Sequence, residues 1–325
     1  MIRQCIAALF VALACTGAHA QQDFPNKRIT IVIGVSPGGT LDTLARVLAQ
    51  GMQTTLKQPV IVENVTGAGG LIGGQRLVKA DPDGYTLGFS NLSLLIIPHL
   101  YPKSGFKPMD DLVPVASIAN VPMVFSVSNA SGIKDLKGLI DYMRAHPGKA
   151  NFGSGGPGTT AHLAEAMFLT QAKVDGVLVQ YRGTGPALVD LMAGTMDGVI
   201  DQTVTMLPLY GEKRARAIAV SAPQRIPQMP DVPTFAEAGL PQFDMTLWNG
   251  VVAPKGTPRA VIDKLAAVIS QVMESQDYKD RVEKQFASAI PNAADRGPDA
   301  FRKVLERDNA KVAALVKAIG LQPAP

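Results

Sequence analysis

The sequence predicts an α/β protein of two lobes, with mostly parallel sheets flanked by helices. Short apolar strands alternate with amphipathic helices along most of the chain, which is typical of βαβ units. The 325 residues are enough for two cores. Segments marked by proline and glycine at 128–132 and 238–241 indicate where the chain crosses between lobes. We therefore expect lobe 1 to comprise residues 21–127 and 242–325, with lobe 2, residues 128–241, inserted between them.

Most of the predicted strands are short apolar runs that contain β-branched residues. In chain order these runs lie at 29–34, 60–63, 86–90, 121–127, 151–153, 177–181, 198–200, 215–220 and 247–252. Each predicted helix repeats apolar residues at a spacing of about 3.6. This pattern covers 43–55, 70–80, 136–145, 160–171, 185–193, 259–273, 278–286 and 298–318. In the first of them Leu41, Leu44 and Leu48 already follow the pattern, so we expect that helix to begin near Thr40.

Two strand-turn-helix segments predict sites for an anion. In the first, the strand at 29–34 leads through Pro37-Gly38-Gly39 directly into a helix. In the second, a strand ends near Gly153 and a helix starts around Thr159. The first N–H groups of a helix have no partner within the helix, and glycines let a ligand approach the backbone closely. Two such sites can grip one ligand between them.

The first twenty residues have the pattern of a secretory signal peptide. Arg3 supplies a positive start, an apolar run follows from Cys5 to Cys15, and Ala18-His19-Ala20 resembles a signal peptidase site. The apolar run is too short for a membrane span of about 20 residues. We therefore expect export to the periplasm and a mature protein that begins at Gln21.

Removal of that segment also removes both cysteines, which excludes disulfides, thiolate metal ligands and a cysteine nucleophile from the mature protein. The net charge of the whole chain is +4, and the basic residues form no block. We expect no nucleic-acid partner, no cofactor and a monomer.

Three motifs suggest other chemistry, and each is incomplete. Gly34-Val35-Ser36-Pro37-Gly38 fits the nucleophile elbow of α/β-hydrolases, but Pro37 lacks the N–H that the oxyanion hole requires, and no histidine follows His162. The segment 153–158, GSGGPG, fits the dinucleotide fingerprint, but the next strand ends in Gln180-Tyr181-Arg182 without the acid that holds the ribose.

A metal site is the third alternative, because His162 and Glu165 are three residues apart on one predicted helix. No further ligands complete the set. A histidine just inside a helix start more often forms a structural or ligand hydrogen bond, and a glutamate such as Glu165 more often faces solvent. We predict neither a metal site nor catalytic residues.

Several segments together resemble the tripartite tricarboxylate transporter receptor family, the Bug-type periplasmic solute-binding proteins, over nearly the whole mature chain. They are PGGTLDTLAR at 37–46, VIVENVTGAGGLIGG at 60–74, DPDGYTLGFSN at 81–91, DLVPVASIA at 111–119, NFGSGGPGTTAHLA at 151–164, VQYRGTGPALVDLMAGTMD at 179–197, MPDVPTFAEAGLPQF at 229–243 and WNGVVAPKGTP at 248–258. The resemblance implies a fold of the Venus-flytrap type, no catalysis, and capture of a small organic anion, usually a carboxylate.

The resemblance also implies where the ligand binds. It places contacts on the turn from Ser36 to Thr40 and, across the cleft, on the segment from Ser154 to Thr159. Tyr181 lies in a segment that commonly reads Val-Pro-Tyr-Lys-Gly in the family and reads VQYRG at 179–183 here, and Thr184 directly follows this segment. The resulting candidates for ligand binding are Ser36, Gly38, Gly39, Thr40, Ser154, Gly155, Gly158, Thr159, Tyr181 and Thr184.

Four further candidates rest on their position in the predicted elements. Ser90 and Asn91 end the third strand, where side chains meet a cleft or cap a helix. His162 follows a helix start. Asp201 follows a strand, where it accepts a hydrogen bond from an N–H or O–H of a ligand, rejects a second carboxylate, or caps the strand end. For Asp42 and Trp248 we favour structural roles, at a helix start and at a hinge or in the core.

We expect a receptor that presents its ligand to membrane transporter subunits or to a sensor. The alternatives are an exported α/β enzyme that acts on a small anion, and a ligand sensor without a transporter.

Overall fold

The computed structural model describes residues 24–323. The predicted signal peptide at 1–20 therefore lies outside the described residues. Among residues 24–323, no helix is long and apolar enough to cross a membrane.

The strands form one mixed sheet that bends through two lobes. In chain order they are β1 (Ile29–Ile33), β2 (Val60–Asn64), β3 (Thr86–Asn91), β4 (Leu112–Ser128), β5 (Asn151–Ser154), β6 (Val177–Gln180), β7 (Gly198–Gln202), β8 (Ala215–Val220) and β9 (Thr246–Pro254). They lie side by side in the order β2-β1-β3-β9-β4-β7-β5-β6, and β8 also pairs with β4. β1 and β5 pair in parallel with their neighbours, whereas β4 and β9 run antiparallel through the middle.

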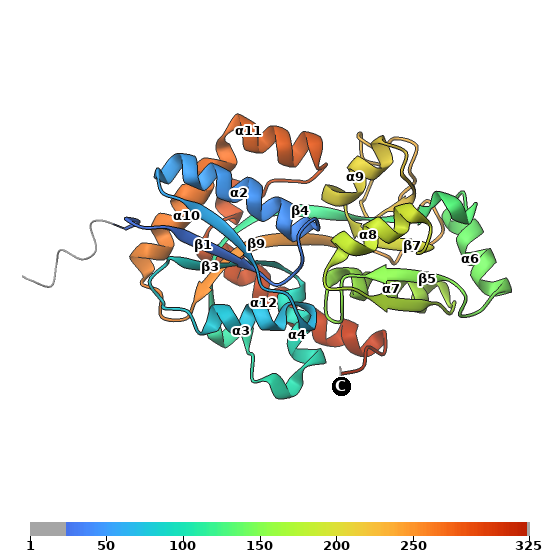
Figure 1. Cartoon of the computed structure of the whole chain (residues 1–325), viewed down its shortest axis with the longest axis horizontal. Helices are drawn as coiled ribbons and strands as arrows, with labels where there is room; N and C mark the ends of the chain where they lie inside the picture. Colours follow the sequence, from blue (N-terminus) through green and yellow to red (C-terminus); the bar gives the residue numbers. More distant parts are fainter. Residues whose placement is uncertain (1–23, 324–325) are drawn as a thin grey trace, which may run out of the picture.

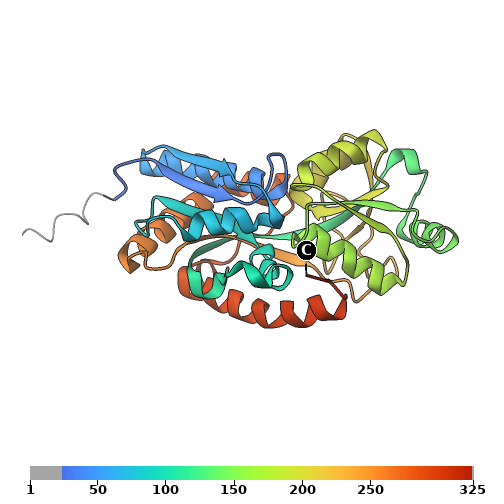
Figure 2. The same ribbon diagram turned by 60° about the horizontal axis from the view of Figure 1, so that its bottom comes forward.

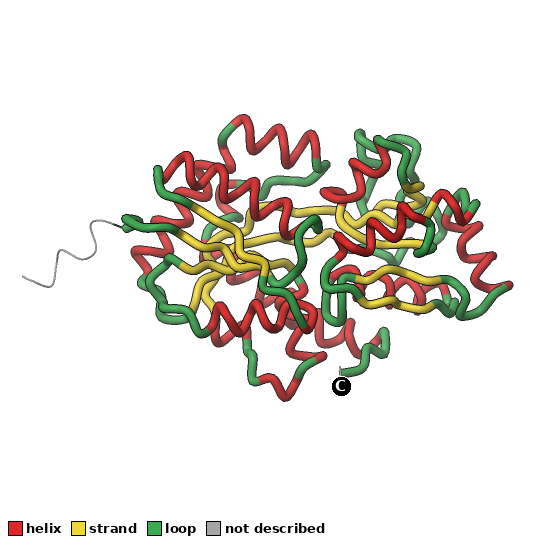
Figure 3. Tube along the Cα trace, viewed as in Figure 1, coloured by secondary structure: helices red, strands yellow, loops and turns green. Residues whose placement is uncertain are grey.

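Helices cover both faces of each half of the sheet (Figure 3). In chain order they are α2 (Thr40–Leu56), α3 (Leu71–Val78), α4 (Ser93–Leu100), α5 (Pro108–Asp111), α6 (Leu136–Ala145), α7 (Thr160–Ala172), α8 (Thr184–Ala193), α9 (Thr203–Gly211), α10 (Arg259–Glu274), α11 (Gln276–Lys279) and α12 (Pro298–Ala318). A π-helical stretch, Asp280–Gln285, continues α11.

The two halves of the molecule share strand β4 (Figure 1). β4 pairs with β9 from Leu112 to Pro122 and with β7 from Met123 to Val127. The change of partner lies within the strand, so a continuous strand links the two lobes. Helix α12 lies along lobe 1 and reaches toward lobe 2 at its C-terminal end (Figure 2). This arrangement confirms the two-lobed α/β fold, whereas the lobe boundaries at 127/128 and 241/242 remain a prediction.

Three differences from the predicted elements have a physical cause. The sequence pattern misses α4 and α9, because buried apolar residues occur on all sides of each and a proline, Pro98 or Pro208, lies inside. The strand predicted at 121–127 extends back to Leu112, since irregularities in its pairing with β9 absorb Pro114 and its neighbours. The helix predicted at 278–286 changes from α to π geometry at Asp280.

Candidate functional site

Five helices begin around one pocket between the lobes. They are α2 and α4 of lobe 1 and α7, α8 and α9 of lobe 2. We call this cavity the interlobe pocket; it is lined by Val35, Gly39, Thr40, Leu41, Asn91, Ser93, Gly155, Thr159, Thr160, Ala161, Gly183, Thr184, Asp201 and Gln202. Its volume is about 30 Å³. Each helix start contributes N–H groups that have no partner within the helix, so donors from both lobes converge on a small volume.

The backbone conformations at these helix starts explain why glycines precede two of them. Gly38 has a positive φ of 88°, and Gly39 then has an extended conformation at the N-cap of α2. Gly183, the N-cap of α8, has a φ of 132°. Neither glycine offers a side chain to cap the helix, and α4 and α9 also lack a side-chain cap. First-turn N–H groups of α2, α8 and α9 therefore stay available to a bound anion, whereas at the start of α4 the Ser93 N–H donates to Asn91 Oδ1 at 3.1 Å.

Asp201 is the single charged residue among the described residues that line the interlobe pocket. Its Oδ2 accepts hydrogen bonds from the Thr184 hydroxyl at 2.6 Å and the Thr205 hydroxyl at 2.9 Å. Burial raises the pKa of Asp201, although these hydrogen bonds favour its charged form. The pocket wall thus presents no lysine or arginine in the part of the chain that the structure describes, and any anion there depends on neutral donors.

Two of the threonine hydroxyls of the pocket already donate to the protein. Thr184 donates to Asp201, and Thr159 donates to the Gly156 carbonyl at 2.8 Å. Their oxygens can still accept hydrogen bonds from a ligand, but their protons are already donated within the protein. The Thr40 hydroxyl is buried without a partner among the described residues, so the pocket can offer a ligand this hydroxyl as well as its free backbone N–H groups.

Backbone atoms of the two lobes touch beside the pocket. The N–H of Ser36 in lobe 1 donates to the carbonyl of Arg182 in lobe 2 at 2.9 Å. A Cβ on Gly185 would lie 2.5 Å from the Pro37 carbonyl oxygen, and one on Gly69 would lie 1.7 Å from that of Pro157. The lobes can approach this closely only because glycine occupies these positions.

The comparisons with known proteins agree with this architecture. Residues 44–321 match the family described as the tripartite tricarboxylate transporter family receptor. The chain belongs to this family. The receptor is 33% identical to protein BugT of Bordetella pertussis, over 97% of its own length and 96% of BugT.

Two solved structures of Rhodopseudomonas palustris proteins resemble the receptor along almost its whole length. MatC with bound malate has a TM-score of 0.86 at 33% identity, covering 90% of this chain and 100% of MatC. Rpa4515 with adipate has a TM-score of 0.88 at 28% identity, covering 93% of this chain and 100% of Rpa4515. These relatives confirm the predicted family and the Venus-flytrap fold.

The structure brings half of the predicted site residues of the receptor together in the interlobe pocket. These residues are Gly39, Thr40, Asn91, Gly155, Thr159, Thr184 and Asp201. The other predicted residues lie near the pocket without lining it, and their role in binding stays a prediction. They are Ser36, Gly38, Ser90, Ser154, Gly158, His162 and Tyr181.

Some of these other residues have partners inside the protein. The Tyr181 hydroxyl donates to Asp190, and with Gly38 this tyrosine lines a separate groove on the surface. Ser154 is fully buried beside Glu165. Ser36 lies against Gly183 at the contact between the lobes. These side chains help to build the walls around the pocket.

The sequence reasoning did not single out seven residues that line the pocket. They are Val35, Leu41, Ser93, Thr160, Ala161, Gly183 and Gln202. Ser93 and Gln202 belong to the starts of α4 and α9, the two helices that the apolar periodicity misses. Gln202 accepts a hydrogen bond from Asn249 at 2.8 Å, which fixes its side chain at the end of β7. The sequence did offer a signal for Gln202 as a pocket residue, because it directly follows the candidate Asp201.

Asp42 and Trp248 have the structural roles that we favoured. Asp42 accepts hydrogen bonds from Arg46, Asn64 and the N–H of Gly38, so it fixes the turn before α2. The indole N–H of Trp248 donates to Asp308, and its ring packs edge-on against Phe301. Both residues lie outside the pocket lining.

His162 holds the loop that precedes α7. Its Nδ1 accepts a hydrogen bond from the N–H of Gly158 at 3.3 Å, which requires a ring without a proton on that nitrogen. Burial lowers the pKa of His162 to about 4. We expect His162 to remain neutral in the folded receptor and to stabilise the loop from Gly155 to Thr159.

His162 should make the receptor less stable in acid. Because its folded pKa is lowered, the unfolded chain binds the proton first, so stability falls as the pH drops from 6.5 to about 4. This shift corresponds to a loss of at most about 3 kcal/mol. Denaturant unfolding of wild type and His162→Gln between pH 7.5 and 4 measures it. If the free energy of unfolding fell equally with pH in the two proteins, the attribution of this acid sensitivity to His162 would be wrong.

Glu165 does not face solvent as the sequence reasoning favoured; it is fully buried. One oxygen accepts a hydrogen bond from the N–H of Ile200 at 3.4 Å. Within the described chain no basic residue pairs with it. Burial, together with the nearby Asp201, raises its pKa well above the ordinary value. The buried environment thus favours the protonated acid, which does not suit a metal ligand.

Glu165→Gln should stabilise the receptor at neutral pH. Since the folded pKa of Glu165 is raised, its favourable contribution is complete below the unfolded pKa of about 4.3 and is lost as the pH rises. Glutamine does not titrate, so the variant lacks this dependence of stability on pH. The gain in melting temperature of the variant over wild type should therefore grow from pH 4.5 to pH 7.5. A variant that is equally destabilised at every pH would indicate that the carboxyl makes specific bonds instead.

Proposed function

We propose that this protein is a periplasmic receptor that captures a small carboxylate between its lobes. The observation that carries the proposal is the convergence of five helix starts on a pocket whose described lining lacks a lysine or arginine. The positive end of each helix dipole and its free N–H groups suit a carboxylate. Asp201 accepts a hydrogen bond from a hydroxyl or amide group on the same ligand.

The energetics of such a site are sufficient for a transport receptor. A hydrogen bond to a charged group contributes about 1.5–3 kcal/mol net. A few such bonds from the starts of α2, α7 and α8, together with burial in the pocket, reach about −8 kcal/mol, which is a micromolar dissociation constant. No arginine is needed for this affinity.

We infer that the structure represents the closed arrangement of the lobes. The hydrogen bond between Ser36 and Arg182 and the close contacts of Gly69 and Gly185 form only when the lobes meet. A ligand enters when β4 and the chain near β9 flex and the lobes separate. The N–H donors of the two lobes then close on the carboxylate from both sides.

The remaining parts of the proposal rest on the family. MatC and Rpa4515 carry malate and adipate in their solved structures, which supports a carboxylate ligand here. We propose export through the segment at 1–20, a monomer, and delivery of the ligand to tripartite tricarboxylate-type transporter subunits. Catalysis is not part of the proposal, because Pro37 lacks the N–H that the oxyanion hole of a nucleophile elbow requires.

A melting experiment tests the proposal. The protein is unfolded and refolded to remove carried ligand, and its stability is measured with dicarboxylates, monocarboxylates, amino acids, aromatic acids and nicotinamides. A ligand at a hundred times its dissociation constant should add about 2.7 kcal/mol, and chromatography should recover it unchanged. If every carboxylate fails while another compound is bound and converted, the enzyme alternative replaces the receptor.

A further inference from the structure

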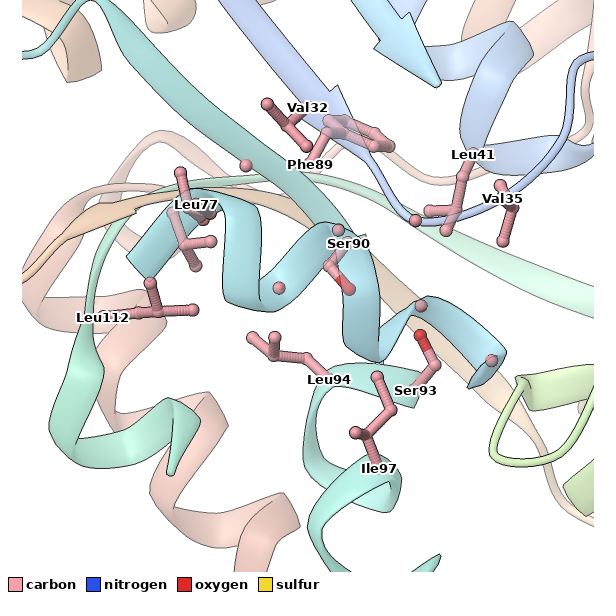
Figure 4. Close-up of a pocket in the computed structure, with 17 residues that line it drawn as sticks. Val32, Val35, Leu41, Leu77, Phe89, Ser90, Ser93, Leu94, Ile97 and Leu112 are labelled. Carbon is pink, nitrogen blue, oxygen red and sulfur yellow. The ribbon is translucent and has the colours of Figure 1, made fainter. Parts of the chain in front are cut away.

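A second small cavity adjoins the interlobe pocket within lobe 1. We call it the side chamber; Figure 4 shows its lining side chains, which come from β1, β3 and α2 on one side and from α3, α4 and the start of β4 on the other. Apart from the hydroxyls of Ser90 and Ser93, its described lining is glycine and apolar side chains, including Leu77, Phe89 and Leu94. Its volume is about 30 Å³.

One face of α3 forms a wall of the side chamber. Gly73, Gly74 and Leu77 line it from within α3, and Gly69 and Gly70 line it just before the helix, so the chamber runs along the N-terminal part of α3 and its start. At this helix start the N–H groups of Gly70 and Ile72 donate to the Gly67 carbonyl, and that of Leu71 donates to the Ala68 carbonyl. The chamber therefore offers a ligand little beyond apolar contact and two hydroxyls, and its described lining carries no charge.

The side chamber and the interlobe pocket share a boundary. Val35, Leu41 and Ser93 line both cavities. Leu41 belongs to the first turn of α2 and Ser93 to the first turn of α4, and both of these helix starts face the carboxylate site. A ligand whose carboxylate is held at these first turns has its next atoms at the entrance of the side chamber.

We propose that the side chamber is the subsite for the remainder of the ligand and that the ligand is a short monocarboxylate with a compact apolar tail. This inference rests on the proposed function. A second carboxylate in the chamber would lose its water without meeting a cation, which is unfavourable. Nor does the interlobe pocket suit it, because the described lining there holds no lysine or arginine to offset a second negative charge.

The size of the side chamber sets the size of the tail. Its volume of about 30 Å³ exceeds the roughly 10–15 Å³ of cavity volume that one water molecule needs. A compact branched group of three or four carbons fits that space with small movements of Leu94 and Ile97, and a long chain does not. The inference therefore predicts a different class of ligand for this receptor from the malate and adipate in the solved structures of its relatives MatC and Rpa4515.

Titration calorimetry with three probes tests the inference on the refolded protein. Acetate reports the carboxylate site alone, 3-methylbutanoate adds a compact apolar tail, and succinate adds a second charge. We expect 3-methylbutanoate to bind at least tenfold more tightly than either of the others. Succinate binding as tightly as 3-methylbutanoate, or more tightly, would overturn the inference and leave the proposed function intact. Failure of all three, and of every other carboxylate, would overturn the proposed function as well.

Two variants test whether the apolar tail of the ligand occupies the side chamber. Leu94→Phe and Ser90→Val each add volume to its walls, and both residues line the side chamber without lining the interlobe pocket. Either variant should lower the ratio of 3-methylbutanoate affinity to acetate affinity at least fivefold. Two variants are needed because Leu94 is buried and Leu94→Phe is the one more at risk of unfolding. An unchanged ratio in a variant that melts cooperatively would overturn the inference.

Discussion

Thr40→Pro should weaken carboxylate binding by about tenfold to a hundredfold, because it removes one N–H that faces the interlobe pocket. Thr40 is the first residue of α2, where proline is well tolerated and the N–H has no partner within the helix. Gly39 before it has the extended conformation that a residue preceding proline adopts. The helix should therefore stay intact, and the lost hydrogen bond to a charged group, about 1.5–3 kcal/mol, should appear in the binding constant.

The matched control is Thr40→Val, which keeps the N–H and removes the hydroxyl. Titration calorimetry of both variants with the same carboxylate separates the two groups. We expect Thr40→Val to bind much more tightly than Thr40→Pro. Equal losses in the two variants would show that the hydroxyl or the packing of Thr40 matters, and the backbone account of this helix start would be wrong.

Gly185→Ala should weaken binding by a similar factor for a different reason. The added Cβ would lie 2.5 Å from the carbonyl oxygen of Pro37 in the opposite lobe, so the methyl group obstructs closure. Overpacking of this kind costs about 1–3 kcal/mol. Within α8 alanine is the better helix former, although Pro186 after it reduces that advantage. We therefore expect nearly unchanged stability without ligand and a clear loss of affinity.

Gly211→Ala serves as the control, because Gly211 ends helix α9 and a Cβ there meets no atom of the described chain within 4 Å. Small-angle X-ray scattering adds a second readout. Wild type and Gly211→Ala should contract when ligand is added, and Gly185→Ala should contract less. If Gly185→Ala binds and contracts as wild type does, the contact between Gly185 and Pro37 is not part of closure.

Most of the sheet and the first anion site were predictable from local patterns. The alternating residues of β1, the Pro37-Gly38-Gly39 turn and the apolar stripe of α2 are all local signals, and the structure confirms each of these elements. The family segments also indicated the opposite wall at Gly155 and Thr159. These two walls meet in one pocket because β1 and β5 run in opposite directions within the sheet, so their carboxyl ends, after which α2 and α7 begin, face each other between the lobes.

The other features of the fold and the site could not be predicted from local patterns, because they depend on contacts between segments far apart in the sequence. α4 and α9 have buried apolar residues on all sides, so their sequences do not show a period. Glu165 resembles a surface residue until the buried β7 is packed against α7. The partner of Tyr181, Asp190, lies nine positions ahead on α8, and only the fold brings it to the hydroxyl. Sequence periodicity reports which face of an element is apolar, and it does not report which polar groups become partners.

A crystal structure of the receptor with its tightest-binding carboxylate tests the central claim most directly. The account predicts carboxylate oxygens within about 2.7–3.2 Å of backbone N–H groups at the starts of helices from both lobes, including that of Thr40. It also predicts that no lysine or arginine side chain touches the carboxylate. A carboxylate held by Arg182 or another cation, or bound outside the interlobe pocket, would contradict the account.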